Sequence, residues 1–286
     1  MADLGLRWLL KKAARRGMAV TASARSATPR RREQHASLRV LTYHRFGEES
    51  HDPFCVRAAD FEQQMALLAN ESLLVSLSDL EEFLAGARNP PDGGILVTID
   101  DGCPSVRTVA LPILREYRIP AVAFIPAGEV AEDGRHGSSN REHPDDRMSW
   151  TDLEELARAG IVIGSHAWTH HSVARMPIER AREHAARSRE AIERRLGTRV
   201  TAFAYPFGTR ADYNTATAAV LKEVGYACAF TSQHGAIRPH AEPFTLPRVK
   251  VEGGEGLWMF RALVRGGLDA WGWIDRTLWK LQAAGT

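Results

Sequence analysis

Short apolar, β-branched runs alternate with amphipathic stretches along most of the chain. The pattern predicts strands over residues 39–43, 95–99, 121–125, 161–164, 202–205, 227–231 and 244–249. It predicts helices over residues 58–70, 77–87, 105–117, 150–159, 178–196 and 212–224. A repeated strand–helix order is typical of an α/β protein with a mostly parallel sheet covered by helices. About seven such strands can form either an open doubly wound sheet or a closed barrel, and the pattern alone does not choose.

Two of the predicted strands end abruptly in clusters of polar residues. ILVTIDDG, residues 95–102, ends in Asp100 and Asp101, and IVIGSHAWTHHS, residues 161–172, contains His166 and His170. Because the ends of parallel strands meet at one rim, these side chains are expected to converge. Two imidazoles and one carboxylate form a three-ligand site for a divalent metal, with one position open to water or substrate. The second carboxylate is then left over as a base.

Each cluster is a weak signal by itself. Asp-Asp-Gly after a strand can be only a turn, and two histidines four residues apart often arise by chance and remain solvated. The joint context favours a site, because both clusters follow strand-like runs and a third such run, TAFAYPFG, follows at residues 201–208. A bound cation would also offset the repulsion between the adjacent carboxylates.

The runs TIDDG, SHAWTH and AYPFG, in this order, resemble the polysaccharide deacetylases of the NodB-homology type, carbohydrate esterase family 4. The opening LTYHRFG, residues 41–47, and the later PRVKV, residues 247–251, resemble the branch of that family that begins with a Tyr-His strand. The resemblance runs from about residue 38 to residue 251. It implies a distorted (β/α)7 barrel with the site at the carboxyl ends of the strands.

The same resemblance implies roles for the residues of the first two motifs. Asp101, His166 and His170 would hold one divalent metal, most readily Zn²⁺, with Co²⁺, Ni²⁺ or Mn²⁺ as alternatives. Asp100 would be the general base that takes a proton from the water attacking an N-acetyl carbonyl. These roles describe a metal-dependent hydrolase that acts on the amide of an N-acetylated sugar.

The third motif is expected to contribute the substrate-facing groups. By resemblance, the backbone N–H of Phe207 would help to hold the oxyanion, a donor of a kind worth about 3–4 kcal/mol. Tyr205 and Pro206, which precede Phe207 in AYPFG, are expected to contact the substrate.

The sequence departs from the family's usual pattern in two places. Ala204 stands where an arginine commonly orients the base, and LPRVKV, residues 246–251, lacks the histidine that usually acts as general acid. His44 ends the first strand-like run, so it is a candidate for the acid, although a structural role under the site is the alternative. Arg248 is expected to orient Asp100 or to bind the substrate.

Composition is consistent with a single globular domain. The chain has 286 residues, of which 44% are hydrophobic and 25% charged, and its net charge is +2. Basic residues alternate with acidic ones along the predicted helices, so a nucleic-acid-binding face is not indicated. Cys55, Cys103 and Cys228 are too few and too scattered for a disulfide framework, and they fit a reducing compartment. Cys103 is interpreted as a small residue at a helix start.

The two ends of the chain differ from the part between them. Residues 1–37 form a basic leader and linker without the order of a secretory signal, and residues 4–20 within it predict a basic amphipathic helix. That helix could lie on an anionic membrane or dock locally. Residues 252–286 predict an aromatic helical extension, more typical of packing against a barrel than of membrane anchoring. We therefore expect a cytoplasmic protein or one peripheral to the membrane.

The segment from residue 129 to residue 149 is polar and too long for an ordinary connection, so it is expected to be a substrate-facing or mobile loop. His143, Asp145 and Asp146 within it are more consistent with solvated side chains than with ligands.

The expected function is N-deacetylation of a cell-surface polysaccharide or of its precursor, for which the partner is an N-acetylated glycan or a lipid-linked sugar. No protein partner is evident. A non-catalytic carbohydrate-binding relative and a hydrolase of another amide are the alternatives. The presence of Asp100 beside three metal ligands favours an enzyme, because a binding module needs no base.

Overall fold

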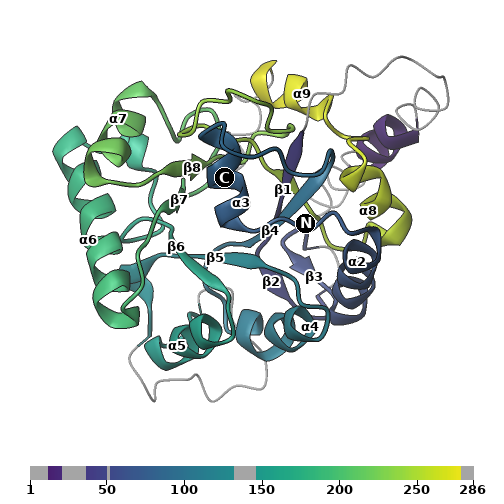
Figure 1. Cartoon of the computed structure of the whole chain (residues 1–286), viewed down its shortest axis with the longest axis horizontal. Helices are drawn as coiled ribbons and strands as arrows, with labels where there is room; N and C mark the ends of the chain where they lie inside the picture. The colour runs from purple at the N-terminus through teal and green to yellow at the C-terminus, as the bar shows by residue number, and fades with distance from the viewer. Residues whose placement is uncertain (1–11, 21–36, 50–51, 132–145, 278–286) are drawn as a thin grey trace, which may run out of the picture.

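Seven parallel strands curl into a barrel surrounded by helices (Figure 1). The computed structural model describes residues 12–20, 37–49, 52–131 and 146–277. The strands are β1 (Leu38–Tyr43), β4 (Gly94–Ile99), β5 (Ala121–Ile125), β6 (Val162–Ser165), β7 (Ala202–Ala204), β8 (Cys228–Phe230) and β9 (Val249–Lys250). Their order is β8-β7-β6-β5-β4-β1-β9, with parallel pairing throughout. The prediction of a distorted (β/α)7 barrel is confirmed.

A kinked segment connects the two edges of the sheet. Leu246 donates its N–H to the carbonyl of Ala229 in β8 and accepts a hydrogen bond from the N–H of Thr231. Three residues later, Val249 pairs with Leu41 of β1. The prediction of one continuous strand over 244–249 was wrong, because Pro247 lacks an N–H and interrupts the ladder.

The structure has a helix in each predicted range, but several begin or end at other residues than predicted. They are α2 (Ala58–Glu71), α3 (Leu77–Leu84), α4 (Leu111–Glu116), α5 (Trp150–Arg158), α6 (Ile178–Leu196) and α7 (Thr215–Val224). Capping boxes at Ser76, Ser149 and Asn214 fix the first turns of α3, α5 and α7, since each cap satisfies N–H groups that the helix cannot. The helix predicted from residue 212 therefore begins at 215.

The stretch predicted as one helix over 105–117 has two parts. A π-helical turn covers Val106–Ala110, and the N–H of Leu111 bonds to the carbonyl of Val106, five residues back. Pro112 stands in the first turn of α4, where its missing N–H costs least. Two short strands, β2 (Arg45–Phe46) and β3 (Cys55–Val56), form a separate parallel pair beside the barrel.

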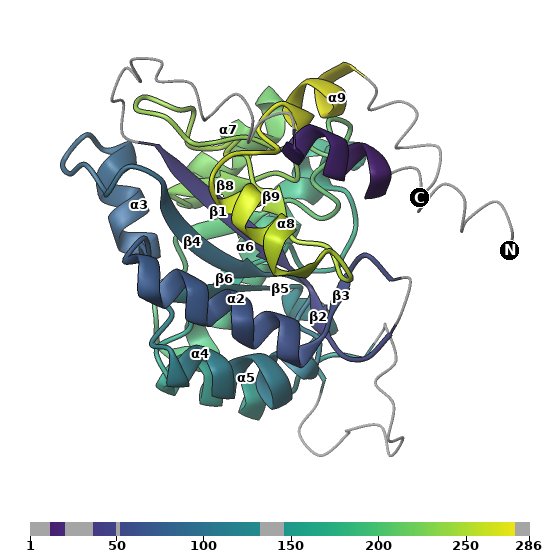
Figure 2. The same ribbon diagram turned by 90° about the vertical axis from the view of Figure 1, so that its right-hand side faces the viewer.

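The terminal parts of the chain lie side by side. The helical residues 12–20 are next to α8 (Gly256–Val264) and α9 (Trp271–Thr277) in both views (Figures 1 and 2). Trp271 is buried, whereas Trp258 and Trp273 are 52% and 61% exposed. Within the described ranges, no helix combines the length and the hydrophobicity needed to span a bilayer.

Candidate active site

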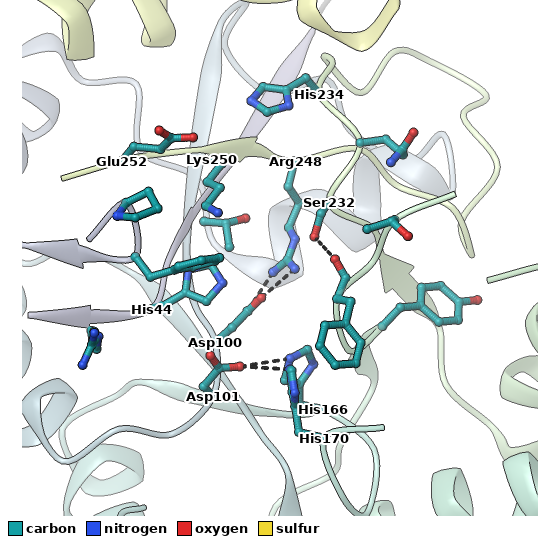
Figure 3. A pocket seen from close by; sticks show the side chains of 18 of the residues that line it. His44, Asp100, Asp101, His166, His170, Ser232, His234, Arg248, Lys250 and Glu252 are labelled. Atoms are coloured by element: carbon teal, nitrogen blue, oxygen red, sulfur yellow. Dashed lines mark hydrogen bonds and ion pairs between the residues drawn. The ribbon is translucent and has the colours of Figure 1, made fainter. Parts of the chain in front are cut away.

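The carboxyl ends of the strands surround a cavity of about 910 Å³. His44 follows β1, Asp100 and Asp101 follow β4, and His166 follows β6. Figure 3 shows these side chains facing a common space. The sequence-predicted residues are therefore brought together by the barrel, as parallel strand ends require.

Asp101, His166 and His170 bring close together three atoms that could bind a metal ion. Asp101 Oδ1 lies 3.4 Å from Nε2 of His166 and 3.3 Å from Nε2 of His170. One ligand atom from each of the three residues lies within 4.8 Å of the other two. His166 is buried, while Asp101 and His170 are partly exposed. A single ion bound by the three would still be accessible from the cavity.

The surroundings of His166 favour a positive charge at this point. Its Nδ1 lies 2.7 Å from the carbonyl oxygen of Ala204, so Nδ1 carries a proton and donates it. Nε2 then faces the carboxylate of Asp101 at 3.4 Å, so either a proton on Nε2 or a bound cation would join the two groups. Burial lowers the pKa of His166, but the contact with Asp101 and the charge of Asp100 outweigh burial and raise it. The donor set of two imidazoles and a carboxylate fits a divalent ion such as zinc.

Arg248 holds Asp100 through two parallel hydrogen bonds. Nη1 donates to Oδ1 at 2.8 Å, and Nη2 donates to Oδ2 at 2.7 Å (Figure 3). Nε donates to the carbonyl of Thr231 at 2.9 Å, which fixes the guanidinium plane. Burial raises the pKa of Asp100, but the charge of Arg248 outweighs burial and lowers it. The sequence left two roles open for Arg248. Its geometry matches the orienting role, and direct contact with substrate stays a prediction.

His44 stands beside the acidic pair but is not hydrogen-bonded to it in the described structure. Its ring lies edge-on to Phe54, with centroids 4.7 Å apart, and its buried Nδ1 has no hydrogen-bond partner among the described residues. Burial lowers the pKa of His44 to about 4, against the opposing charges of Asp101 and Asp100. The side chain is therefore neutral at pH 7, and it can act as an acid only after it receives a proton.

The third motif forms a tight turn that exposes one aromatic ring. The N–H of Gly208 bonds to the carbonyl of Pro206 at 2.7 Å. Phe207, between them, is 46% exposed, and its ring centroid lies 4.7 Å from that of His170. Tyr205 and Pro206 are buried, and the Tyr205 hydroxyl donates to the carbonyl of Phe244 at 3.1 Å. The proposed substrate contacts of Tyr205 and Pro206 and the oxyanion role of Phe207 stay predictions.

Each of the three motifs contains a non-glycine residue with a strained backbone. Asp101, Ala167 and Phe207 have φ values of 71°, 65° and 61°, in the left-handed region that favours glycine. Each such residue costs on the order of 1 kcal/mol or more and persists only where its surroundings hold it. One strained residue therefore accompanies each of the three motifs.

Sequence reasoning missed Glu129, which supports the loop of the second motif. Glu129 Oε1 accepts a hydrogen bond from the N–H of His170 at 2.5 Å, and Arg147 Nε lies 3.3 Å from Oε2. Glu129 ends a short 3-10 turn, Ala127–Glu129, directly after β5. Its position after a strand was the available signal, but Glu129 opened a polar segment that was interpreted as a loop. His143 and Asp145 of that segment lie outside the described residues.

A second missed feature is a group of charged residues next to the cavity. His234 Nδ1 lies 2.9 Å from Asp275 Oδ2, and both residues line the cavity. Arg15, which is fully buried, donates to both carboxylate oxygens of Glu255 at 2.6 and 3.0 Å. These residues come from distant parts of the sequence, so no local pattern could have grouped them.

A sequence profile described as polysaccharide deacetylase matches residues 87–229, half of the 286-residue chain. The chain belongs to the polysaccharide deacetylase family. The matched range contains the motif residues from Asp100 to Phe207. It excludes His44 and Arg248, which reach the site from outside it.

Two relatives cover more of this polysaccharide deacetylase chain. YxkH of Bacillus subtilis is 24% identical over 223 residues, which are 78% of this chain and 74% of the relative. The poly-β-1,6-N-acetyl-D-glucosamine N-deacetylase of Staphylococcus aureus strain MRSA252 is 23% identical over 209 residues, 69% of this chain and 68% of that protein.

Solved structures share the fold. The Streptococcus pyogenes deacetylase PplD, solved in complex with acetate, superposes with a TM-score of 0.70 at 18% identity and covers 81% of this chain and 98% of its own. IcaB from Ammonifex degensii superposes with a TM-score of 0.68 at 28% identity and covers 82% of this chain and 98% of its own.

Proposed function

We propose that this polysaccharide deacetylase is a metal-dependent N-deacetylase of a cell-surface polysaccharide built from N-acetylglucosamine, or of its lipid-linked precursor. The observation that carries the proposal is that two adjacent carboxylates have different partners. Asp101 faces two histidines, while Asp100 is held by Arg248. The Staphylococcus aureus relative, named for poly-β-1,6-N-acetyl-D-glucosamine, supports this substrate class.

Asp101, His166 and His170 are the residues that would hold a divalent metal, with zinc the leading choice and cobalt, nickel or manganese as alternatives. When bound, such an ion supplies Lewis-acid chemistry, which polarises a carbonyl and lowers the pKa of water to about 7. The hydrogen bond from His166 Nδ1 to Ala204 keeps Nε2 directed toward Asp101. The backbone contact of Glu129 keeps the His170 end of the loop in place.

Asp100 is the general base in this proposal. Its lowered pKa keeps it ionised at neutral pH, and Arg248 fixes the plane of its carboxylate. Asp100 takes a proton from the attacking water, whose oxygen forms a bond to the acetyl carbon. The backbone N–H of Phe207 stabilises the negative oxygen that results. The C–N bond then breaks, which gives acetate and an amine.

His44 is the candidate for the group that protonates the leaving nitrogen. Its neutral ring takes up the proton that Asp100 removed from the water and passes it to the leaving nitrogen, which restores Asp100 and gives a neutral amine, a contribution of about 100-fold to 10,000-fold in rate. The neighbouring charges of Asp101 and Asp100 favour the protonated ring, opposing the effect of burial.

Metal removal and restoration tests the proposal. Acetate release is measured with a panel of N-acetylated glycans, before and after chelation and after return of zinc, cobalt, nickel or manganese. We expect activity to fall at least about 100-fold on chelation and to return with the metal. Activity that survives complete metal removal would refute the mechanism. Metal binding without turnover of any glycan would favour a non-catalytic carbohydrate-binding protein.

A further inference from the structure

Arg15 lies directly behind the wall of the active-site cavity. Its side chain is fully buried, although it belongs to the helical residues 12–20 near the start of the sequence. Nε and Nη2 donate to the two carboxylate oxygens of Glu255, and Nη2 also donates to the carbonyl of Lys250 at 3.0 Å. Lys250 is one of the residues that line the cavity. Arg15 therefore holds the backbone of a residue whose side chain faces the site.

The carbonyl that Arg15 binds is on the outer edge of β9. The N–H of Val251 donates to the carbonyl of Thr42 in β1. The C=O and N–H of one peptide group point in opposite directions, so the carbonyl of Lys250 points away from β1. β9 is the last strand in the sheet order, and an edge carbonyl shielded from water needs another partner. Arg15 provides that partner and holds β9 from the side opposite β1.

A second contact of Arg15 is with the segment that pairs with Arg248. The N–H of Arg248 donates to the carbonyl of Gln233 at 2.9 Å. The next residue is His234, whose Nδ1 lies 2.9 Å from Oδ2 of Asp275 and carries a proton, because a carboxylate only accepts. Nε2 of His234 is then an acceptor, and it lies 3.5 Å from Nη1 of Arg15. One guanidinium therefore contacts β9 and the segment next to it.

Arg248 and Lys250 reach the site from the same face of β9. Residues two apart in a strand share a face, and Figure 3 shows both side chains extending from this strand into the pocket. Arg248 holds Asp100 through two hydrogen bonds. Lys250 Nζ lies 3.3 Å from the ring centroid of Phe54, which packs edge-on against His44. A shift of β9 would therefore move the groups beside both the proposed base and the proposed acid.

We propose that Arg15 is a positioning residue for the deacetylation reaction: it holds β9 at its outer edge and so fixes Arg248 against Asp100. The inference rests on the proposed function and deepens it, because it makes the helix of residues 12–20 part of what the reaction requires. Arg15 acts through Arg248 and not by contact with the reacting groups. Its effect is expected in kcat rather than in KM, since the base acts after the substrate has bound.

A double-mutant cycle of Arg15→Lys and Arg248→Lys tests the proposal with zinc-loaded protein and an N-acetylglucosamine oligomer. Lysine keeps the charge beside Glu255, but one ammonium cannot keep the fork to Glu255 and the bond to Lys250 together. We expect Arg15→Lys to lower kcat about 10-fold, within the roughly 100-fold that a remote misplacement can cost, with KM and metal content unchanged. In the Arg248→Lys background, where Asp100 has already lost its paired bonds, the same change should lower kcat by less than about twofold.

Glu255→Gln tests the same contact from the other side. The two carboxylate oxygens of Glu255 fix the guanidinium plane, so a neutral amide of the same size should loosen the bond from Arg15 to Lys250. We expect kcat to be about threefold lower, as weakening of one hydrogen bond implies. This loss should also disappear in the Arg248→Lys background.

Leu80→Ala is the matched control for loss of stability. Leu80 is a fully buried residue of α3. Just before α3, Leu74 bridges to Ile95 near the start of β4, whereas Asp100 follows the other end of that strand. Leu80→Ala should lower the melting temperature at least as much as Arg15→Lys. At a temperature where all variants are folded, it should leave kcat unchanged.

Amide hydrogen exchange tests the hold on β9 without turnover. The relevant amides are those of Val251, bonded to Thr42, and of Arg248, bonded to Gln233. In Arg15→Lys they should exchange about 10-fold faster, since loss of a neighbouring hydrogen bond makes local opening easier. The amides of β5, in the middle of the sheet, should keep their rates.

Three results would each overturn the positioning role: losses of kcat that multiply in the double variant, an equal loss of kcat in Leu80→Ala, or unchanged exchange at Val251 and Arg248. The proposed function fails in a different way, if the wild-type protein releases no acetate from any N-acetylated glycan. The exchange rates decide whether Arg15 holds β9 in either case.

Discussion

At the scale of single residues, Arg248 provides what the third motif lacks. Ala204 removes the arginine that commonly orients the base, and Arg248 reaches Asp100 from the segment before β9 with a two-pronged hydrogen bond. The bidentate geometry fixes the carboxylate plane, which a single point charge cannot do. In the proposed mechanism, the base Asp100 is therefore oriented by a residue that directly precedes another strand of the barrel.

Arg248→Lys should lower kcat/KM by about 10-fold to 100-fold, as loss of a supporting contact does in metal sites. Lysine keeps the charge but cannot make both parallel bonds. Arg248 lowers the pKa of Asp100, so a weaker partner should let that pKa rise. The base must be ionised, so the rising limb of kcat/KM should move to higher pH. The pH profile of acetate release measures the shift, and an unchanged profile would contradict the orienting role.

His44 should make the protein less stable in mild acid. Its pKa is about 4 in the folded protein, against about 6.5 in an unfolded chain. Between these values the unfolded state binds more protons, so stability is present above about pH 6.5 and is lost as the pH falls toward 4. The melting temperature of metal-free protein should therefore fall less over this range in His44→Gln. If the melting temperature falls equally in the wild-type protein and in His44→Gln, then His44 is not buried as a neutral ring.

At the scale of secondary-structure elements, the helix of residues 12–20 is part of the folded protein. The sequence left open whether its basic side chains face a membrane or dock locally. Lys12 and Arg15 are buried against Glu252 and Glu255, so these two charges are used inside the protein. Arg16 is exposed. Peripheral membrane contact stays a prediction for the exposed side chains.

Two adjacent arginines of this helix allow a matched comparison. Arg15→Ala should lower the free energy of unfolding by about 3–5 kcal/mol, because it leaves buried carboxylates with too little positive charge. Arg16→Ala, at an exposed position, should change it by less than about 0.5 kcal/mol. Urea unfolding of both variants measures the difference. Similar stabilities for the two would show that the helix is not docked through Arg15.

At the scale of the whole molecule, the strand pattern predicted a parallel sheet and the meeting of Asp101, His166 and His170 at one rim, while the barrel was predicted only through the family resemblance of the three motifs. Parallel strands place their ends at one rim, so local runs determine a long-range arrangement. Closure of the barrel was harder to predict. The residues before Pro247 bond to β8 and its vicinity, and the residues after it pair with β1. Which strands lie next to this segment is set by the whole fold, so the sequence around Pro247 does not reveal it.

Contacts between distant segments were the least predictable part of the site. The support of His170 by Glu129 and the burial of Arg15 beside Glu255 join residues without a shared local pattern. Only the packing of complete elements brings these side chains together, so a single sequence gives little sign of them.

The most direct test of the account compares acetate release and metal content in wild-type protein and in Asp100→Asn. The substrate is an N-acetylglucosamine oligomer, and both proteins are loaded with zinc. Asp100→Asn should retain about one equivalent of metal, because Asp101 and the two histidines remain, and should lose at least about 100-fold in kcat through loss of the base. Near-normal turnover by Asp100→Asn, or loss of its metal, would contradict the assignment of one carboxylate to the base and the other to the metal.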